Sequence, residues 1–235
     1  MSDKSLTGKV LPLVAAATML LAIGMIFFYL PEMKGESGEV LDSSFRIFYF
    51  HMPIAITSYL AFTVVFVSSV LYLKNGEYKW DIISRSAAEV GVIFALLVLV
   101  TGSIWAKATW GWYWIWEPRL TTSLALFLVY VAYLLLRQAI DAPDKRARLA
   151  AVFGILGFVS VPLSFLSIRL WRSAHPLMFG EAASGSGGGL EGTSLQLTLL
   201  VNIVAFLLLF AAIVSYKIGN EDLEEEISSL RASLR

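Results

Sequence analysis

Long runs of apolar residues dominate the chain, and short polar stretches separate them. Six such runs occur, at residues 10–30, 45–73, 87–105, 120–136, 149–168 and 195–216. A helix needs about 20 mainly apolar residues to cross ~30 Å of hydrocarbon, and each run reaches or approaches that length. In lipid the backbone polar groups must be satisfied within the segment, and the runs are too long for barrel strands. The pattern therefore predicts an all-α polytopic membrane protein, with a six-transmembrane-helix bundle as a single domain over residues 1–235.

Composition agrees with this class. The chain is 57% hydrophobic and 15% charged, with a mean hydropathy of +0.73, which fits no soluble globular class. The apolar composition makes the lipid bilayer the expected surroundings of the chain. The formal net charge is zero and no basic stripe is present, so we expect no nucleic acid as a partner. The first run lacks a small-residue cleavage site after it, and we expect it to remain as an uncleaved helix.

The distribution of Lys and Arg predicts the orientation of the bundle. Twelve of them lie in the two tails and in the connections 74–86 and 137–148, whereas six lie in or beside the alternate connections. Cytoplasmic connections carry the excess of positive residues in membrane proteins. Both termini are therefore predicted to be cytoplasmic, and the segment 105–121 is predicted to face the outside.

That outward segment, 105–121, is rich in indoles. It holds five of the seven tryptophans: Trp105, Trp110, Trp112, Trp114 and Trp116. The last four occupy alternate positions, which share one face of an extended segment, so the spacing predicts a flat aromatic shelf for a large planar ligand. An interfacial aromatic belt is the alternative, but a belt marks both interfaces and only Trp80 is expected on the other side. The fourth helix is expected to start within this segment, with Pro118 in its first turn.

Both histidines are predicted to lie on the same side as the indoles. His51 is about six residues into the second run, hence roughly 9 Å below its outer start at helical rise. A histidine inside a membrane helix is costly unless it faces a cavity, pairs with another group or binds a metal. His175 follows the outer end of the fifth run, and a solvated loop histidine is the alternative interpretation there.

The chain has no cysteine, which restricts the chemistry further. Disulfides, thiolate ligands and thioether attachment of a cofactor are excluded, so a bound cofactor must be held reversibly. Two imidazoles that converge over aromatic rings meet the need of a haem iron for two axial ligands, which predicts non-covalent haem b held by His51 and His175. A zinc site is the competing interpretation. It would need carboxylates such as Glu32, Asp42 or Glu117, and it leaves the indoles unexplained.

The run Trp110-Gly111-x-x-Trp114-x-Trp116-Glu117-x-Arg119-Leu120-Thr121 resembles the tryptophan-rich signature of the cytochrome c assembly family. The chain is most similar to the small six-helix members of that family, which export haem for cytochrome c biogenesis. The resemblance implies an outward haem platform in a cell inner membrane, with His51 and His175 as axial iron ligands. The other cofactor-binding residues that it implies are Trp110, Trp112, Trp114, Trp116, Glu117 and Arg119.

The same resemblance implies haem transport rather than catalysis, so no catalytic residue and no enzyme activity are expected. Its partners would be a membrane-anchored haem chaperone, an ABC-type release complex and a small single-span subunit. Trp114, Trp116 and Glu117 are expected to dock the chaperone as well as to contact haem. Haem propionates are negatively charged and seek a guanidinium, for which Arg119 of the signature is the candidate; an ion pair with Glu117 is its alternative role.

The chain departs from the family pattern at two places. Glu117 stands where these members more often have Asp, and the surroundings of His175 keep only Trp171 of a tryptophan pair and have Pro176 in place of Gln. Three other functions stay open at this stage. They are a small transporter or channel with an aromatic gate, a subunit of a haem-attaching synthetase, and a membrane redox enzyme with fixed haem. A channel would need polar groups along the helices, and a redox enzyme a second haem or a quinone site.

Overall fold

The structure is a computed structural model that describes residues 2–31, 43–173, 175 and 193–233, with side chains described from residue 10 to residue 221 within those ranges. All regular structure in the described part of the chain is helical. Six helical segments there are long and apolar enough to cross a membrane. The prediction of an all-α protein with six membrane spans is therefore confirmed.

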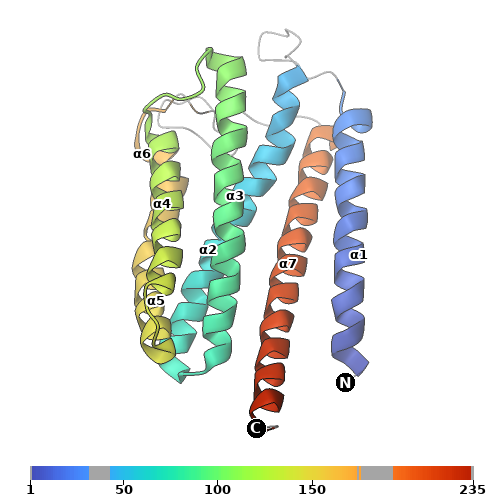
Figure 1. Cartoon of the computed structure of the whole chain (residues 1–235). Coiled ribbons are helices and arrows are strands. Elements are labelled where there is room, and N and C mark those ends of the chain that lie inside the picture. Colours follow the sequence, from blue (N-terminus) through green and yellow to red (C-terminus); the bar gives the residue numbers. More distant parts are fainter. Residues whose placement is uncertain (1, 32–42, 174, 176–192, 234–235) are drawn as a thin grey trace.

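The spans are built from the following elements, shown in Figure 1. They are α1 (Ser2–Gly24), a π-helical turn (Met25–Tyr29), a 3₁₀ turn (Ser43–Ile47), α2 (Phe48–Asn75), α3 (Tyr78–Trp110), α4 (Pro118–Gln138), α5 (Pro143–Gly157), α6 (Ser160–Leu170) and α7 (Thr193–Ser233). The fifth span is divided between α5 and α6. Pro162 explains this break, because it has no N–H to donate to the carbonyl of Phe158 and its ring displaces that carbonyl.

The third helix is longer at both ends than the predicted run 87–105. It begins at Tyr78 and ends at Trp110, so Trp80 and Trp110 belong to a helix rather than to a connection. Gly111 ends α3 in the left-handed conformation, with φ of 78°, and its N–H donates to the carbonyl of Lys107 at 3.1 Å. The length of the apolar run is shorter than that of α3, because polar and indole-bearing turns continue the helix beyond the apolar stretch.

The bundle has a central pair of helices and two flanks. α2 packs along α3; α4, α5 and α6 lie together on one flank, and α7 with α1 lies on the other (Figure 1). Both termini lie at one end of the bundle, and the connection 111–117 lies at the opposite end. The termini therefore share a side, as the predicted topology requires. Which side is cytoplasmic stays a prediction.

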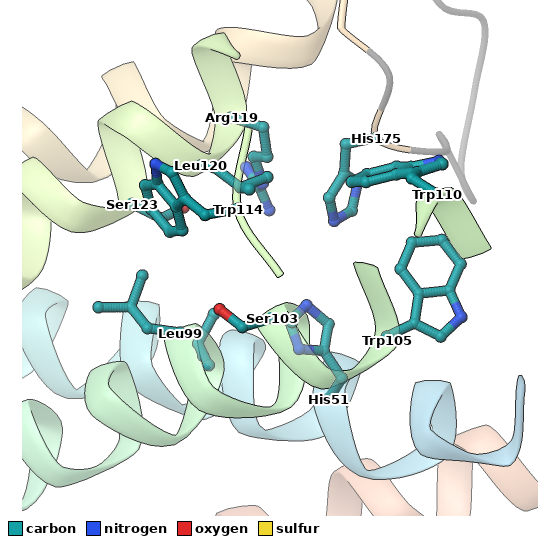
Figure 2. A pocket seen from close by; sticks show the side chains of 12 residues that line it. His51, Leu99, Ser103, Trp105, Trp110, Trp114, Arg119, Leu120, Ser123 and His175 are labelled. Carbon is teal, nitrogen blue, oxygen red and sulfur yellow. The ribbon is translucent and has the colours of Figure 1, made fainter. Parts of the chain in front are cut away.

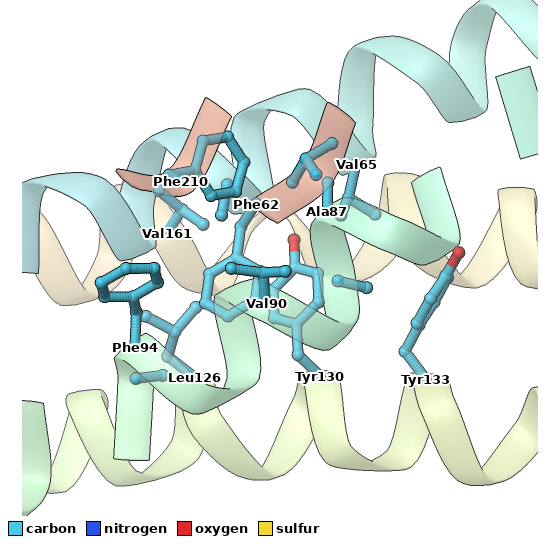
Figure 3. Packing of buried hydrophobic residues seen from close by; sticks show 14 of the residues in the cluster. Phe62, Val65, Ala87, Val90, Phe94, Leu126, Tyr130, Tyr133, Val161 and Phe210 are labelled. Atoms are coloured by element: carbon cyan, nitrogen blue, oxygen red, sulfur yellow. The ribbon is translucent and has the colours of Figure 1, made fainter. Parts of the chain in front are cut away.

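Close helix contacts and stacked rings form the core shown in Figure 3. A Cβ atom at Gly91 of α3 would lie 2.9 Å from the Cβ of Ala61 on α2, so the approach of the central pair depends on the absence of a side chain there. Phe62 and Tyr130 stack with ring centroids 3.6 Å apart, which ties α2 to α4. This packing fixes the three helices that carry the site described below.

A buried ion pair joins α3 and α4 at the end of the bundle that holds the termini. The Arg137 guanidinium donates to both carboxylate oxygens of Asp81 at 2.6 and 2.7 Å, and both side chains are buried. Arg137 also donates to the hydroxyl of Tyr133, which shares a 2.9 Å hydrogen bond with Ser84. Such a bidentate pair, with its remaining groups hydrogen-bonded, holds the two helices in one register.

Candidate functional site

A cavity opens at the end of the bundle that carries the connection 111–117, with about 450 Å³ of space between its walls, part of which is open to solvent. It lies between α2, α3, the first turns of α4 and residue 175 (Figure 2). Its lining consists of His51, Val98, Leu99, Gly102, Ser103, Trp105, Trp110, Trp114, Arg119, Leu120, Ser123 and His175. Both predicted iron ligands, two of the four tryptophans in residues 110–116 and Arg119 therefore meet in one place.

His51 stands in the first turns of α2 and is held by α3. Its Nδ1 atom lies 2.8 Å from Oγ1 of Thr101, whose hydroxyl donates to the carbonyl of Leu97 at 2.7 Å. Since that hydroxyl proton is engaged by Leu97, the tautomer with the proton on Nδ1 is the one that completes both hydrogen bonds, with His51 donating to Thr101. Nε2 of His51 is then an unprotonated acceptor, which is the state a metal ligand needs.

Gly102 sets the distance between the His51 ring and α3. A Cβ atom at this position would lie 3.1 Å from Cε1 of His51, tighter than ordinary van der Waals contact. The imidazole can thus lie against the α3 backbone only because residue 102 has no side chain. Thr101 and Gly102, adjacent on α3, together hold the ring in place.

His175 faces His51 across the cavity. Their ring centroids are 6.3 Å apart and the ring planes differ by 37°, and Figure 2 shows both rings pointing into the same space. The ring of Trp105 lies 6.3 Å from that of His175. These contacts favour the interpretation that His175 faces the cavity over the interpretation that it is a solvated loop histidine.

Glu117 is turned inward. It is the N-cap of α4, only 8% exposed, and its Oε1 accepts from the backbone N–H of Leu120 at 2.6 Å. Its Oε2 accepts from the hydroxyl of Ser173, whose oxygen in turn accepts from the backbone N–H of His175 at 3.1 Å. The side chain thus connects α4 to the segment that carries the second histidine.

Arg119 belongs to the cavity wall rather than to a pair with Glu117. Its Nη1 donates to the carbonyl of Ser164 on α6 at 2.5 Å, and its guanidinium lies 5.8 Å from the ring centre of Tyr59. These contacts hold the cation beside the cavity. An arginine fixed in this way is suited to meet an anionic group of a ligand.

The tryptophans divide into two sets instead of forming one flat shelf. Trp110 and Trp114 line the cavity, whereas Trp112 and Trp116 are 69% and 77% exposed and lie outside its lining. The planes of Trp114 and Trp116 differ by 80°, so these rings are edge to face. The alternation expected for an extended strand fails because Trp110 ends a helix, Gly111 adopts a left-handed conformation, and the N–H of Glu117 bonds to Ile115 in a tight turn.

Several residues of the site were not predicted. Gly102 and Trp105 line the cavity from α3 together with Val98, and this spacing of three to four residues is a helical signal that the sequence did contain. Thr101, on the same helix, contacts His51. Ser123 lies on α4 in the same way. Ser173 carried no such signal, because its contact with Glu117 spans 56 residues of sequence.

The geometry gives little support to the zinc alternative. Glu32 and Asp42 lie outside the described residues, and Glu117 is engaged by Leu120 and Ser173. Within the part of the chain that the structure describes, no group of three or more His, Cys, Asp or Glu side chains is arranged to hold a metal ion. The two facing imidazoles remain as the predicted metal ligands.

Comparisons with known proteins identify the family of the chain. A family model described as "Heme exporter protein C" matches residues 2–233. The chain is 34% identical to Heme exporter protein C of Bradyrhizobium diazoefficiens over 228 residues, covering 97% of this chain and 84% of that protein. It is 29% identical to the protein of that name from Paracoccus denitrificans, covering 96% and 92%.

A more distant relative of the same name, from Escherichia coli K12, is 30% identical over 69% of this chain and 65% of its own length. The match to the family model covers nearly the whole chain, including both histidines and the tryptophan segment. The chain belongs to the Heme exporter protein C family.

Proposed function

We propose that this protein binds haem b non-covalently between His51 and His175 and delivers it for cytochrome c maturation. The observation that carries this proposal is the 6.3 Å separation of the two imidazole centroids across the cavity. A metal held at ~2 Å from a nitrogen of each ring, the usual length for imidazole ligands, puts the centroids roughly 6 Å apart. The separation therefore leaves room for one iron and matches axial ligation from two sides.

The walls of the cavity suit a porphyrin. Apolar and aromatic surface of the kind that lines small-molecule sites comes from Leu99, Leu120, Trp110 and Trp114. The indole N–H of Trp114 is buried without a hydrogen-bond partner in the described structure, so a ligand acceptor would satisfy it. The donor set and the lining thus both fit a haem that is mainly held by apolar contact and two imidazoles.

Arg119 is the residue that we assign to a haem propionate. It lines the cavity, whereas the other outer arginines, Arg46, Arg169 and Arg172, are not part of the lining. A carboxylate in a partly apolar site gains most from a guanidinium that is already held in place. Tyr59 and Ser164 supply that support.

The exposed tryptophans are assigned to docking of the haem chaperone. Trp112 and Trp116 flank the cavity-lining Trp114 in sequence, are exposed and are not part of the lining, and exposed aromatic residues contribute strongly to binding at protein interfaces. Trp114 lines the cavity and is assigned to haem contact instead, and Glu117 is buried and bonded to Leu120 and Ser173. Haem handed over at an open edge needs such a surface next to it.

The remaining parts of the proposal rest on the family and on charge. The excess of Lys and Arg on the side of the termini supports an outward, periplasmic haem site in the inner membrane. The chaperone, an ABC-type release complex and a small single-span subunit are the partners that we propose. No catalytic group is required, because exchange of iron ligands and docking perform the task.

Transfer of haem from the purified protein to a membrane-anchored haem chaperone tests this function. We expect wild-type protein to carry haem and load the chaperone, and Trp116→Ala to keep its haem but to load the chaperone several-fold more slowly. Trp114→Ala should instead lose haem. Transfer by Trp116→Ala at the wild-type rate would remove the docking role, and a purified wild-type protein unable to bind or pass on haem would contradict the function as a whole.

A further inference from the structure

The two histidines are held in different ways. His51 belongs to α2 and packs against Thr101 and Gly102 of α3, so two helices fix its ring. His175 lies five residues beyond the end of α6 at Leu170. A ligand that lies outside a helix needs another restraint if it is to face its partner across a cavity.

Glu117 and Ser173 provide that restraint. Glu117 is 8% exposed, and its Oε1 accepts from the backbone N–H of Leu120 at 2.6 Å. Its other oxygen accepts from the hydroxyl of Ser173. The same hydroxyl oxygen accepts from the backbone N–H of His175 at 3.1 Å. The serine therefore uses its donor on the carboxylate and an acceptor position on the histidine backbone.

Charge favours this arrangement. The carboxylate lies at the N-terminus of α4, where backbone N–H groups and the helix dipole stabilise a negative group. A hydroxyl that donates to an ionised and largely buried carboxylate forms a stronger bond than one between neutral groups. The interaction depends on one serine hydroxyl, so a single substitution can remove it.

We propose that Glu117 and Ser173 position His175 for iron ligation, and we call this pair the Glu117–Ser173 link. The inference rests on the proposed function, since it assigns a role toward the same haem site. Neither residue touches the iron in this account. Their role is to place the imidazole of His175 opposite that of His51.

The link also couples two walls of the cavity. Glu117 caps the helix whose first turn carries Arg119 and Leu120, and both of these residues line the cavity. Movement of α4 at its first turn would therefore shift His175 as well. On this account, a displacement of the tryptophan segment and the first turn of α4 would move His175, whereas His51 is held between α2 and α3.

Substitution of Ser173 tests the inference in the purified full-length protein loaded with haem. Ser173→Ala removes the hydroxyl and leaves the N-cap bond of Glu117 intact. We expect it to raise the high-spin, five-coordinate fraction and to weaken haem affinity roughly 10- to 100-fold, the usual effect of losing an outer-shell partner of a metal ligand. Ser173→Thr keeps a hydroxyl and should restore the low-spin spectrum. Ser160→Ala on α6, which removes a hydroxyl outside the cavity lining, is the matched control and should leave the spectrum unchanged.

Added imidazole separates positioning from general damage. If His175 has merely moved away, free imidazole should occupy the vacant position and restore the low-spin spectrum of Ser173→Ala, as it should in His175→Ala. A double-mutant cycle with Glu117→Gln should show that the two effects are not additive. A Ser173→Ala protein with the wild-type spectrum and affinity overturns the link.

The controls distinguish failure of the link from failure of the haem assignment. If His51→Ala and His175→Ala change the spectrum but Ser173→Ala does not, the haem site stands and the link is wrong. If His175→Ala itself leaves the low-spin spectrum unchanged, the proposed ligand is wrong, and the link then has no ligand to position.

Discussion

The Nδ1 atom of His51 lies 2.8 Å from Oγ1 of Thr101, and the threonine hydroxyl is itself committed to the carbonyl of Leu97. This relay favours the tautomer of His51 with the proton on Nδ1. It leaves Nε2 free to bind a metal, and it orients the ring from α3 rather than from the helix that carries the histidine. One polar residue inside a membrane helix thus has a specific task at the site.

Replacing Thr101 with Val should weaken haem binding without unfolding the protein. The substitution keeps the shape of the side chain but removes the acceptor for His51 Nδ1–H, and losses of about 10- to 100-fold in metal affinity are usual for such outer-shell changes. Thr101→Ser retains the hydroxyl and should bind as the wild type does. Haem titration followed by absorbance measures the difference, and equal affinity of Thr101→Val and wild type would remove Thr101 from the site.

Replacing Gly102 with Ala should displace the His51 ring. The new Cβ would lie 3.1 Å from Cε1, so the imidazole or α3 has to shift. We expect part of the protein to lose six-coordinate haem. Gly219→Ala on α7, where a Cβ meets nothing within 4 Å, is the matched control. The prediction fails if both variants give the same spectrum.

Replacing Arg119 with Gln should reduce retention of haem in mild detergent. The guanidinium lines the cavity, and a charge-assisted hydrogen bond to a propionate contributes about 1.5–3 kcal/mol, or roughly a 10- to 150-fold change in affinity. Arg172→Gln removes an exposed arginine outside the lining and serves as the control. Haem content after repeated washing is the measurement. Retention equal to that of the control would show that the propionates lie elsewhere.

Breaking the Asp81–Arg137 pair should affect stability rather than the haem spectrum. Removal of one member leaves a buried charge without its partner, which typically costs about 3–5 kcal/mol. Arg85 is exposed and pairs with Glu89 and Glu221, so Arg85→Gln should cost only about 1 kcal/mol. Thermal unfolding in detergent compares Asp81→Asn with Arg85→Gln. A similar melting temperature for both would show that the buried pair contributes little.

Hydrophobic pattern was sufficient to predict the spans and the start of α4. Long apolar runs have few structural solutions in a membrane, and Pro118 occupies the first position of α4 as expected. The pattern could not reveal that α3 reaches from Tyr78 to Trp110, because its end turns are polar or rich in indoles. Nor could it pair Asp81 with Arg137, since both lay in connections by hydropathy alone.

The sequence was sufficient to predict those residues of the candidate site whose type alone marks them as functional. His51, His175 and Arg119 stand out because such groups are rare in or beside apolar runs, and the structure brings them to one cavity. The orientation of the indoles was not predictable, since it depends on a helix end and a left-handed glycine rather than on a strand. The inward role of Glu117 was hidden as well, because Ser173 is distant in sequence.

The optical and electron paramagnetic resonance spectra of the haem-loaded full-length protein test the central claim most directly. The account predicts a low-spin, six-coordinate, bis-imidazole signature in the wild type. His51→Ala and His175→Ala should each convert it to a high-spin or weakly bound form that free imidazole returns toward low spin. A bis-imidazole spectrum that survives in both variants would contradict ligation by this pair of histidines.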